Sequence, residues 1–187
     1  MEFVRMSKKQ LETAILGGGC FWCLEAVYEL LDGVDTVTSG ASGGHIVNPS
    51  YQDICSGSSG HVEVVQIQFD PGVTDYREIL DVFFTIHNPT TLNRQGNDVG
   101  NQYRSAIFYH SNKQQEAAKS KISELTNNEI WEDPIVTEVL PFRKFYPAEN
   151  YHQKYYSKNG HQPYCKLTID PKIAKLRSKF SHKIRSL

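Results

Sequence analysis

The chain has little that would direct it to a membrane, to nucleic acid or to an oxidising compartment. None of its apolar runs approaches the roughly eighteen residues that a membrane-spanning helix requires. Its 20 basic and 21 acidic side chains leave a formal net charge of −1, so no overall charge attracts DNA or RNA. The N-terminal segment 1–10 has no apolar signal-peptide core, and four cysteines in 187 residues are too few for a disulfide scaffold. We therefore expect a cytoplasmic protein with reduced thiols and with no nucleic-acid or membrane partner.

The spacing of apolar residues predicts an α+β fold in a single domain over residues 1–187. Alternating or continuous apolar runs predict strands, and apolar residues three and four apart predict helices. The strands are expected at 11–16, 34–38, 62–69, 104–109 and 135–140, and the helices at 20–31, at 75–87 and from Ser111 onward. This order predicts a two-layer α/β sandwich with a mixed sheet, that is, a ferredoxin-like core with long loops.

Three segments fall outside this regular pattern. The segments 39–60 and 88–102 are rich in glycine and polar residues and read as ordered loops that carry function. The last sixteen residues, 172–187, contain six Lys or Arg and no acid. We expect this basic tail to be a solvated terminal helix or a frayed end, and a contact with an acidic partner is the alternative.

Cys20 is the first candidate for chemistry. It follows Gly17-Gly18-Gly19 at the predicted start of a helix, where unpaired N–H groups and the helix dipole lower a thiol pKa. The alternative is that Cys20 and Cys23 are small buried apolar side chains. The glycines before Cys20 and the two aromatic residues after it favour a nucleophile.

Glu63 is the second candidate, because of its place in the strand 62–69. Alternation puts it on the same face as Val65, Ile67 and Phe69, so a core-facing strand would bury its carboxyl and raise its pKa. A carboxyl that stays protonated near neutrality is a proton donor. The alternative is a carboxylate at a fraying strand end, satisfied by His61 or by a loop amide.

A metal site is the weaker interpretation of the cysteines and histidines. Cys20 and Cys23 have the spacing of one half of a zinc site, but no second pair with metal-ligand spacing follows, and Cys55 and Cys165 stand alone. We expect no metal and no cofactor.

Four motifs, taken in order, resemble the A-type peptide methionine sulfoxide reductases. Together they lie within residues 15–165, which is nearly the whole chain. They are Gly19-Cys20-Phe21-Trp22-Cys23, then Asn48-Pro49-Ser50-Tyr51 with Gly60-His61-Val62-Glu63, then the run from Asn93 to Ser105, and finally the run from Ala148 to Tyr155.

This resemblance implies a reaction and a set of site residues. Cys20 would attack the sulfur of methionine sulfoxide, giving methionine and a sulfenic acid on Cys20. Glu63 matches the proton donor of the family, and Tyr51 and Tyr103 match phenols that hydrogen-bond the sulfoxide oxygen. Asp98 matches an acidic residue that organises the pocket. The substrates implied are free and protein-bound methionine sulfoxide.

The resemblance also implies an apolar wall, formed here by Phe21 and Trp22, that holds the substrate methyl group and selects the S epimer. Glu149 and His152 are expected to brace the site. One position departs from the family pattern, since Ala41 stands where a tyrosine is common. We expect that change to affect local packing or pocket lining rather than the thiol chemistry.

The family uses a second thiol to convert the sulfenic acid into a disulfide, which thioredoxin then reduces. The sequence leaves the identity of this resolving cysteine open. Cys165 ranks first because its segment reads as a flexible tail and resembles family members with a tail cysteine, followed by Cys55 and then Cys23.

Two other functions fit parts of the sequence. A thioredoxin-like disulfide oxidoreductase would explain the Cys20-x-x-Cys23 spacing, but disulfide exchange has no use for Glu63, Asp98 and the two tyrosines. A thiol-containing module that binds methionine side chains between Phe21 and Trp22 without turnover is the second alternative.

Overall fold

A computed structural model describes residues 10–186 of the chain. Residues 1–9, where the sequence predicts no signal peptide, and Leu187, the end of the basic tail, lie outside the described residues. The described part contains a six-stranded sheet with the order β7-β6-β1-β3-β2-β8 and a separate two-stranded sheet. The strands of the large sheet are β1 (Glu12–Gly17), β2 (Val34–Ser42), β3 (Val62–Phe69), β6 (Ala106–Tyr109), β7 (Glu138–Pro141) and β8 (Phe145–Pro147).

The large sheet is mixed, as predicted. All of its neighbouring strands are antiparallel except β6 and β7, which run parallel. The small sheet pairs β4 (Arg94–Gln95) with β5 (Asp98–Val99) inside the predicted loop 88–102. Together with the helices, this confirms the α+β class.

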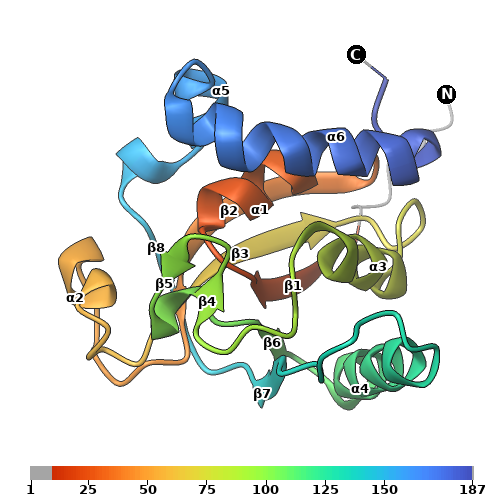
Figure 1. Ribbon diagram of the computed structural model, residues 1–187, viewed down its shortest axis with the longest axis horizontal. Coiled ribbons are helices and arrows are strands. Elements are labelled where there is room, and N and C mark those ends of the chain that lie inside the picture. The colour runs from red at the N-terminus through yellow and green to blue at the C-terminus, as the bar shows by residue number, and fades with distance from the viewer. Residues whose placement is uncertain (1–9, 187) are drawn as a thin grey trace, which may run out of the picture.

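The helices gather mainly on one face of the sheet. They are α1 (Phe21–Tyr28), α2 (Tyr51–Cys55), α3 (Tyr76–Ile86), α4 (Asn112–Asn127), α5 (Tyr155–Asn159) and α6 (Asp170–Lys179). Figure 1 shows α6 lying across α1 and α3, whereas α2 stands apart from the sheet at the left of the view. The main core lies between the sheet and α1, α3 and α6.

Strand β3 shows how the alternation divides between two cores. Val65, Ile67 and Phe69 point into the main core under the helices, whereas Val62 and Val64 point to a smaller cluster on the opposite face. That smaller cluster also contains Ile15, Ala106 and Phe108. The predicted parity of β3 is therefore confirmed, and Glu63 shares the face of the main core.

Helix ends follow local capping chemistry where side chains supply it. Asp75 caps α3, accepting from the Glu78 N–H while the Glu78 carboxylate accepts from the Asp75 N–H. Ser111 caps α4, but the Gln114 side chain accepts from the His110 N–H, so the capping box expected there is incomplete. Helix α1 ends at Tyr28, three residues before the predicted end.

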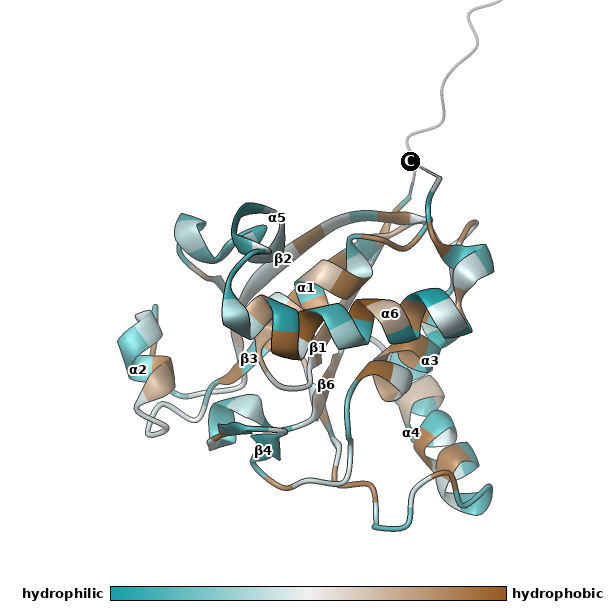
Figure 2. Ribbon diagram, turned by 45° about the horizontal axis from the view of Figure 1, so that its top comes forward, coloured by the Kyte–Doolittle hydropathy of each residue, from teal (hydrophilic) through white to brown (hydrophobic). Residues whose placement is uncertain are grey.

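The first part of the basic tail is a terminal helix, as expected, but one of its faces is packed rather than solvated. Helix α6 buries Ile173 and Leu176 against the core, and Figure 2 shows its apolar residues interspersed with polar ones. The half-buried Lys172 donates from Nζ to the carbonyl oxygen of Ile86 at 2.8 Å. Apolar residues at helical spacing within a lysine-rich segment were the signal for this packing.

Among residues 10–186, no helix is both long enough and apolar enough to span a bilayer.

Candidate active site

Glycines make room for the turn that carries Cys20. Gly19, between β1 and α1, has a φ of +92°, and a Cβ there would lie 2.6 Å from Cγ of Gln95. Gln95 is held in place by its side-chain amide, which bonds the N–H of Asn88 at 3.0 Å and its carbonyl oxygen at 2.9 Å. Only glycine combines this backbone conformation with so close a neighbour. The turn sets Cys20 at the N-cap of α1.

The environment of Cys20 differs from the one predicted. Cys20 is only 7% exposed. Burial, followed by its hydrogen bond with Cys23 and the charge of Glu63, raises the pKa of the Cys20 thiol well above its usual value. The first N–H of α1, on Phe21, donates instead to Oε2 of Glu63 at 3.1 Å. The predicted lowering of the Cys20 pKa is therefore wrong, because desolvation outweighs a helix terminus that Glu63 already uses.

Glu63 has the buried environment that the sequence predicts. Its side chain is 1% exposed, and burial raises its pKa to about 8, with the charge of Asp98 adding to the effect. The carboxyl is satisfied by the Phe21 amide rather than by His61, whose ring bonds Gly44 and Ile46 instead. Glu63 is therefore held protonated at neutral pH beside Cys20.

The two predicted phenols lie around the same carboxyl. Tyr51 is the first residue of α2, and Tyr103 ends the short 3-10 helix Asn101–Tyr103. Burial, and after it the nearby charge of Glu63, raises the pKa of Tyr103, and burial is also the main cause of the raised pKa of Tyr51. Both phenols therefore stay protonated and can donate hydrogen bonds.

Asp98 joins this group through a residue that the sequence interpretation did not single out. The Tyr164 hydroxyl donates to Oδ2 of Asp98 at 2.9 Å and lies 3.9 Å from Sγ of Cys23. Cys20, Cys23, Asp98 and Tyr164 line a cavity of about 390 Å³, together with Lys172 and parts of the β4–β5 hairpin. Asp98 therefore connects the hairpin to the C-terminal segment at the thiol pair.

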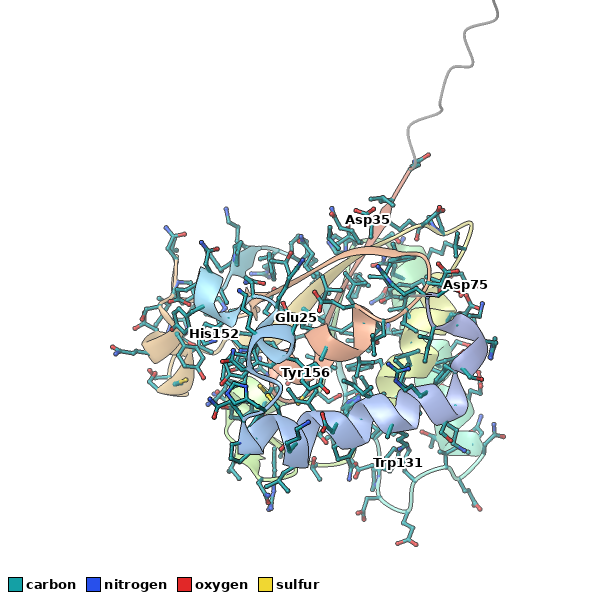
Figure 3. The ribbon with its side chains drawn as sticks, turned by 90° about the horizontal axis from the view of Figure 1, so that it is seen from above. Glu25, Asp35, Asp75, Trp131, His152 and Tyr156 are labelled. Carbon is teal, nitrogen blue, oxygen red and sulfur yellow. The ribbon has the colours of Figure 1, made fainter. Side chains whose placement is uncertain are left out.

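The aromatic residues after Cys20 differ in exposure. Phe21 is fully buried, whereas Trp22 is half-buried and stacks on Tyr155 with ring centroids 3.7 Å apart. The Trp22 indole N–H donates to Nδ1 of His152 at 3.2 Å, and the His152 ring lies 4.3 Å from the Tyr51 ring. His152, labelled in Figure 3, therefore lies between α1 and α2.

Glu149 and His152 hold the site residues in place, as expected of bracing residues. Oε1 of Glu149 accepts from the N–H of Tyr51 at 3.3 Å, and His152 fixes the Trp22 ring. The buried Glu25 adds a brace that the sequence did not reveal. Its carboxyl accepts from the N–H groups of Lys154 and Tyr155, at 2.8 and 3.2 Å.

Ala41, the departure from the family pattern, pairs with Glu63 in the register between β2 and β3. Its other neighbour across the sheet is Tyr146 of β8, and Ala41 is fully buried. The smaller side chain therefore lies beside the carboxyl rather than in a distant part of the fold.

The cysteines occupy unequal positions. All four are free thiols. Cys23 hydrogen-bonds with Cys20, and this bond is the largest cause of the lowered pKa of Cys23. Cys165 is fully buried, so its segment is not the flexible tail that the sequence predicts, and Cys55 is exposed at the end of α2. Within residues 10–186, no group of three or more His, Cys, Asp or Glu could hold a metal ion.

Comparison with known proteins identifies the family. The sequence model of a family described as peptide methionine sulfoxide reductase matches residues 12–184. The chain belongs to this family. The peptide methionine sulfoxide reductase MsrA of Chromobacterium violaceum is 55% identical over 176 residues, covering 94% of this chain and 100% of that protein.

Solved structures agree with this membership in the peptide methionine sulfoxide reductases. Mxr1 from Saccharomyces cerevisiae in reduced form is similar with a TM-score of 0.76 at 34% identity, covering 87% of this chain and 93% of that one. Mxr1 in complex with Trx2 is similar with a TM-score of 0.53 at 26% identity, covering 82% and 91%. The chain is therefore not a member of the thioredoxin-like disulfide oxidoreductases.

Proposed function

We propose that this chain reduces the S epimer of methionine sulfoxide, free or within proteins, to methionine, using Cys20 as the nucleophile. The observation that carries the proposal is the buried Glu63 carboxyl, whose pKa of about 8 keeps a proton available where the first turn of α1 presents Cys20. Reduction of a sulfoxide must protonate the departing oxygen, and a carboxyl with this pKa suits that task at neutral pH.

The first step balances with the groups present. The Cys20 sulfur attacks the sulfoxide sulfur, and the Cys20 proton passes to the nearby Glu63, replacing the proton that Glu63 gives to the substrate. Glu63 protonates the sulfoxide oxygen, which leaves the substrate and ends as the hydroxyl of a Cys20 sulfenic acid. Methionine is released, the substrate sulfur has gained two electrons, and the Cys20 sulfur has lost two.

Tyr51 and Tyr103 are proposed to donate hydrogen bonds to the oxygen as negative charge develops on it. Their raised pKa values keep both hydroxyl protons in place. Asp98 would orient the pocket through Tyr164. Trp22, with Phe21 beneath it, would contact the substrate methyl group and select the S epimer.

Cys23 is the proposed resolving cysteine, ahead of Cys165 and Cys55. It shares a hydrogen bond with Cys20, and residues three apart on a helix have Cβ atoms about 5–6 Å apart, within reach of a disulfide after local distortion. Its attack on the sulfenic acid forms the disulfide and releases water. Thioredoxin would then reduce the disulfide, and the complex of the yeast relative with Trx2 supports that partner.

Three structural predictions stay proposals. The strand order β6-β1-β3-β2, antiparallel throughout, supports a ferredoxin-like two-layer core. The main cluster of buried residues, which extends from β1 to α6, supports a single domain. A cytoplasmic location stays a prediction from the sequence.

The decisive experiment measures turnover of the separate S and R epimers of a blocked methionine sulfoxide, with dithiothreitol as the reductant. The wild-type chain is compared with Cys20→Ser. We expect reduction of the S epimer alone, and none by the variant. If reduced wild-type protein turns over neither epimer but retains methionine binding, the non-catalytic binding module replaces the enzyme.

A further inference from the structure

Lys172 is a cation from the basic tail that reaches the thiol pair. It lies near the start of α6, and its side chain lines the same cavity as Cys20 and Cys23. Its ammonium donates to the carbonyl oxygen of Ile86 at 2.8 Å, which is a neutral acceptor. A half-buried ammonium with a neutral partner is stabilised by any negative charge that forms in the cavity beside it.

The charges around Lys172 indicate that its positive charge acts mainly on Cys23. Burial lowers the pKa of Lys172, and the charges of Cys23, Cys20 and Asp98 oppose that lowering, in this order. In turn, the charge of Lys172 lowers the pKa of Cys23, and the hydrogen bond from Cys20 is the larger cause of that lowering. The charge of Lys175 also lowers the pKa of Lys172, whereas the nearby His87 is kept neutral by burial and by the two lysine charges.

The remaining groups that face Cys23 do not supply a cation. Asp98 opposes its ionisation, whereas Tyr164 contributes a neutral hydroxyl 3.9 Å from Sγ. The charge of Cys23 also raises the pKa values of Cys165 and Glu63. Neither of these two groups can carry a positive charge. Lys172 is therefore the positive group that the described cavity offers to a thiolate.

We propose that Lys172 is a positioning residue for the recycling step, holding negative charge on Cys23 so that it attacks the sulfenic acid of Cys20. The inference rests on the proposed function and on Cys23 as its resolving cysteine. In this step the Cys23 thiolate forms the S–S bond, and the S–O bond of Cys20 breaks. The Cys20 sulfur is reduced and the Cys23 sulfur is oxidised. The oxygen leaves as hydroxide, which takes up the proton released by Cys23 and becomes water.

The assignment gives the basic tail a role in the second half-reaction. Methionine formation depends on Cys20, Glu63 and the two phenols, on the β3 side of Cys20. Disulfide formation depends on Cys23 and Lys172, on the α6 side. Loss of Lys172 should therefore slow disulfide formation much more than methionine formation.

The test is a single turnover of reduced protein with one equivalent of methionine sulfoxide, quenched at intervals. Methionine release reports the first step. Loss of two alkylatable thiols, together with disappearance of the sulfenic acid that dimedone labels, reports the second. Lys172→Gln keeps a donor for Ile86 but removes the charge. At neutral pH we expect disulfide formation to slow by roughly tenfold, which corresponds to a change of about one pKa unit in Cys23, while methionine release changes far less.

The pH profile distinguishes a charge effect from a packing effect. In Lys172→Gln the rise of the disulfide-forming rate with pH should move to higher pH, so that the rates of the variant and of wild type converge once Cys23 is ionised in both proteins. Lys172→Arg should restore the wild-type profile in large part, and Lys119→Met, at an exposed position of α4, should leave it unchanged. Lys172→Met tests the same loss of charge if Lys172→Gln fails to fold.

Two outcomes would overturn the inference. One is an unmoved pH profile of disulfide formation in the neutral variants, and the other is an equal slowing of both steps. Failure of the proposed function gives a different result, because the wild-type protein would then release no methionine at all.

Discussion

The main-chain N–H of Phe21 donates a hydrogen bond of 3.1 Å to Oε2 of Glu63, which joins the first residue of α1 to the second residue of β3. This bond fixes the carboxyl beside the residue that carries the nucleophile. It also occupies the helix N–H that would otherwise stabilise a Cys20 thiolate. This arrangement supports the proposed proton donation by Glu63 and disfavours a preformed thiolate on Cys20.

Replacing Glu63 by Gln should abolish the proton donor while keeping the bond to Phe21. We expect the rate of methionine formation to fall by about 10²- to 10⁴-fold, the usual contribution of a general acid. The measurement is single-turnover release of methionine at neutral pH. Alkylation of Cys20 by iodoacetamide should continue in the variant, which shows that the nucleophile itself is intact, and a rate of methionine formation within a factor of about two of wild type would remove Glu63 from the mechanism.

The same carboxyl makes stability depend on pH. Burial raises the pKa of Glu63 from 4.5 to about 8 in the folded protein, so the native state keeps a proton that the unfolded chain releases. Stability from this group is complete below about pH 4.5 and is lost as pH rises through about 8. Urea titrations of wild type between these limits should show a falling free energy of unfolding, by a few kcal/mol in total.

Glu63→Gln is the matched control for that pH dependence. Its amide carries no titrating proton, so the fall in stability over the same range should be smaller in the variant than in wild type. Parallel curves for the two proteins would show that Glu63 titrates normally in the folded state.

Loss of a phenol should slow the first step without affecting the second. Tyr103→Phe removes one of the two proposed donors to the sulfoxide oxygen, and we expect a loss of at least about tenfold in methionine formation. Tyr109→Phe is the control, because that hydroxyl accepts from Gln115 on α4 and takes no part in the site. Equal rates for Tyr103→Phe and wild type would contradict the role.

Single cysteine replacements should identify the resolving thiol. Cys23→Ser is expected to release one methionine per chain with dithiothreitol absent, and to keep a sulfenic acid that dimedone labels. Cys55→Ser and Cys165→Ser should instead form the intramolecular disulfide at the wild-type rate. Accumulation of the sulfenic acid in Cys165→Ser would restore the order expected from the sequence.

Strand β3 and the site around it were predictable from the sequence because their signals are local. Alternation in the run from Val62 to Phe69 is sufficient to assign Glu63 to the core face, and burial then determines the direction of its pKa. The resemblance added Tyr51, Tyr103 and Asp98, and the structure places all three near Glu63 and the thiol pair. Their chemical roles stay predictions.

The remaining features depend on distant parts of the chain. The Cys20 pKa could not be predicted from its place at a helix start, because burial in the folded chain reverses the expected direction. Tyr164 and Lys172 are separated from Cys23 by most of the sequence, and neither has a local pattern that indicates a site. The buried Glu25 was missed for the same reason, since its partners are the amides of Lys154 and Tyr155.

The separation between Cys23 and Tyr164, 141 residues, also has a consequence during protein synthesis. The thiol pair leaves the ribosome long before the segment that covers it. At about 5–20 residues per second, this interval lasts on the order of ten to thirty seconds. For that time the nascent chain exposes two sulfurs without the Tyr164 ring that later lies beside Cys23. We therefore expect the enzyme that repairs oxidised sulfur to be open to oxidative damage itself until its C-terminal segment has been made.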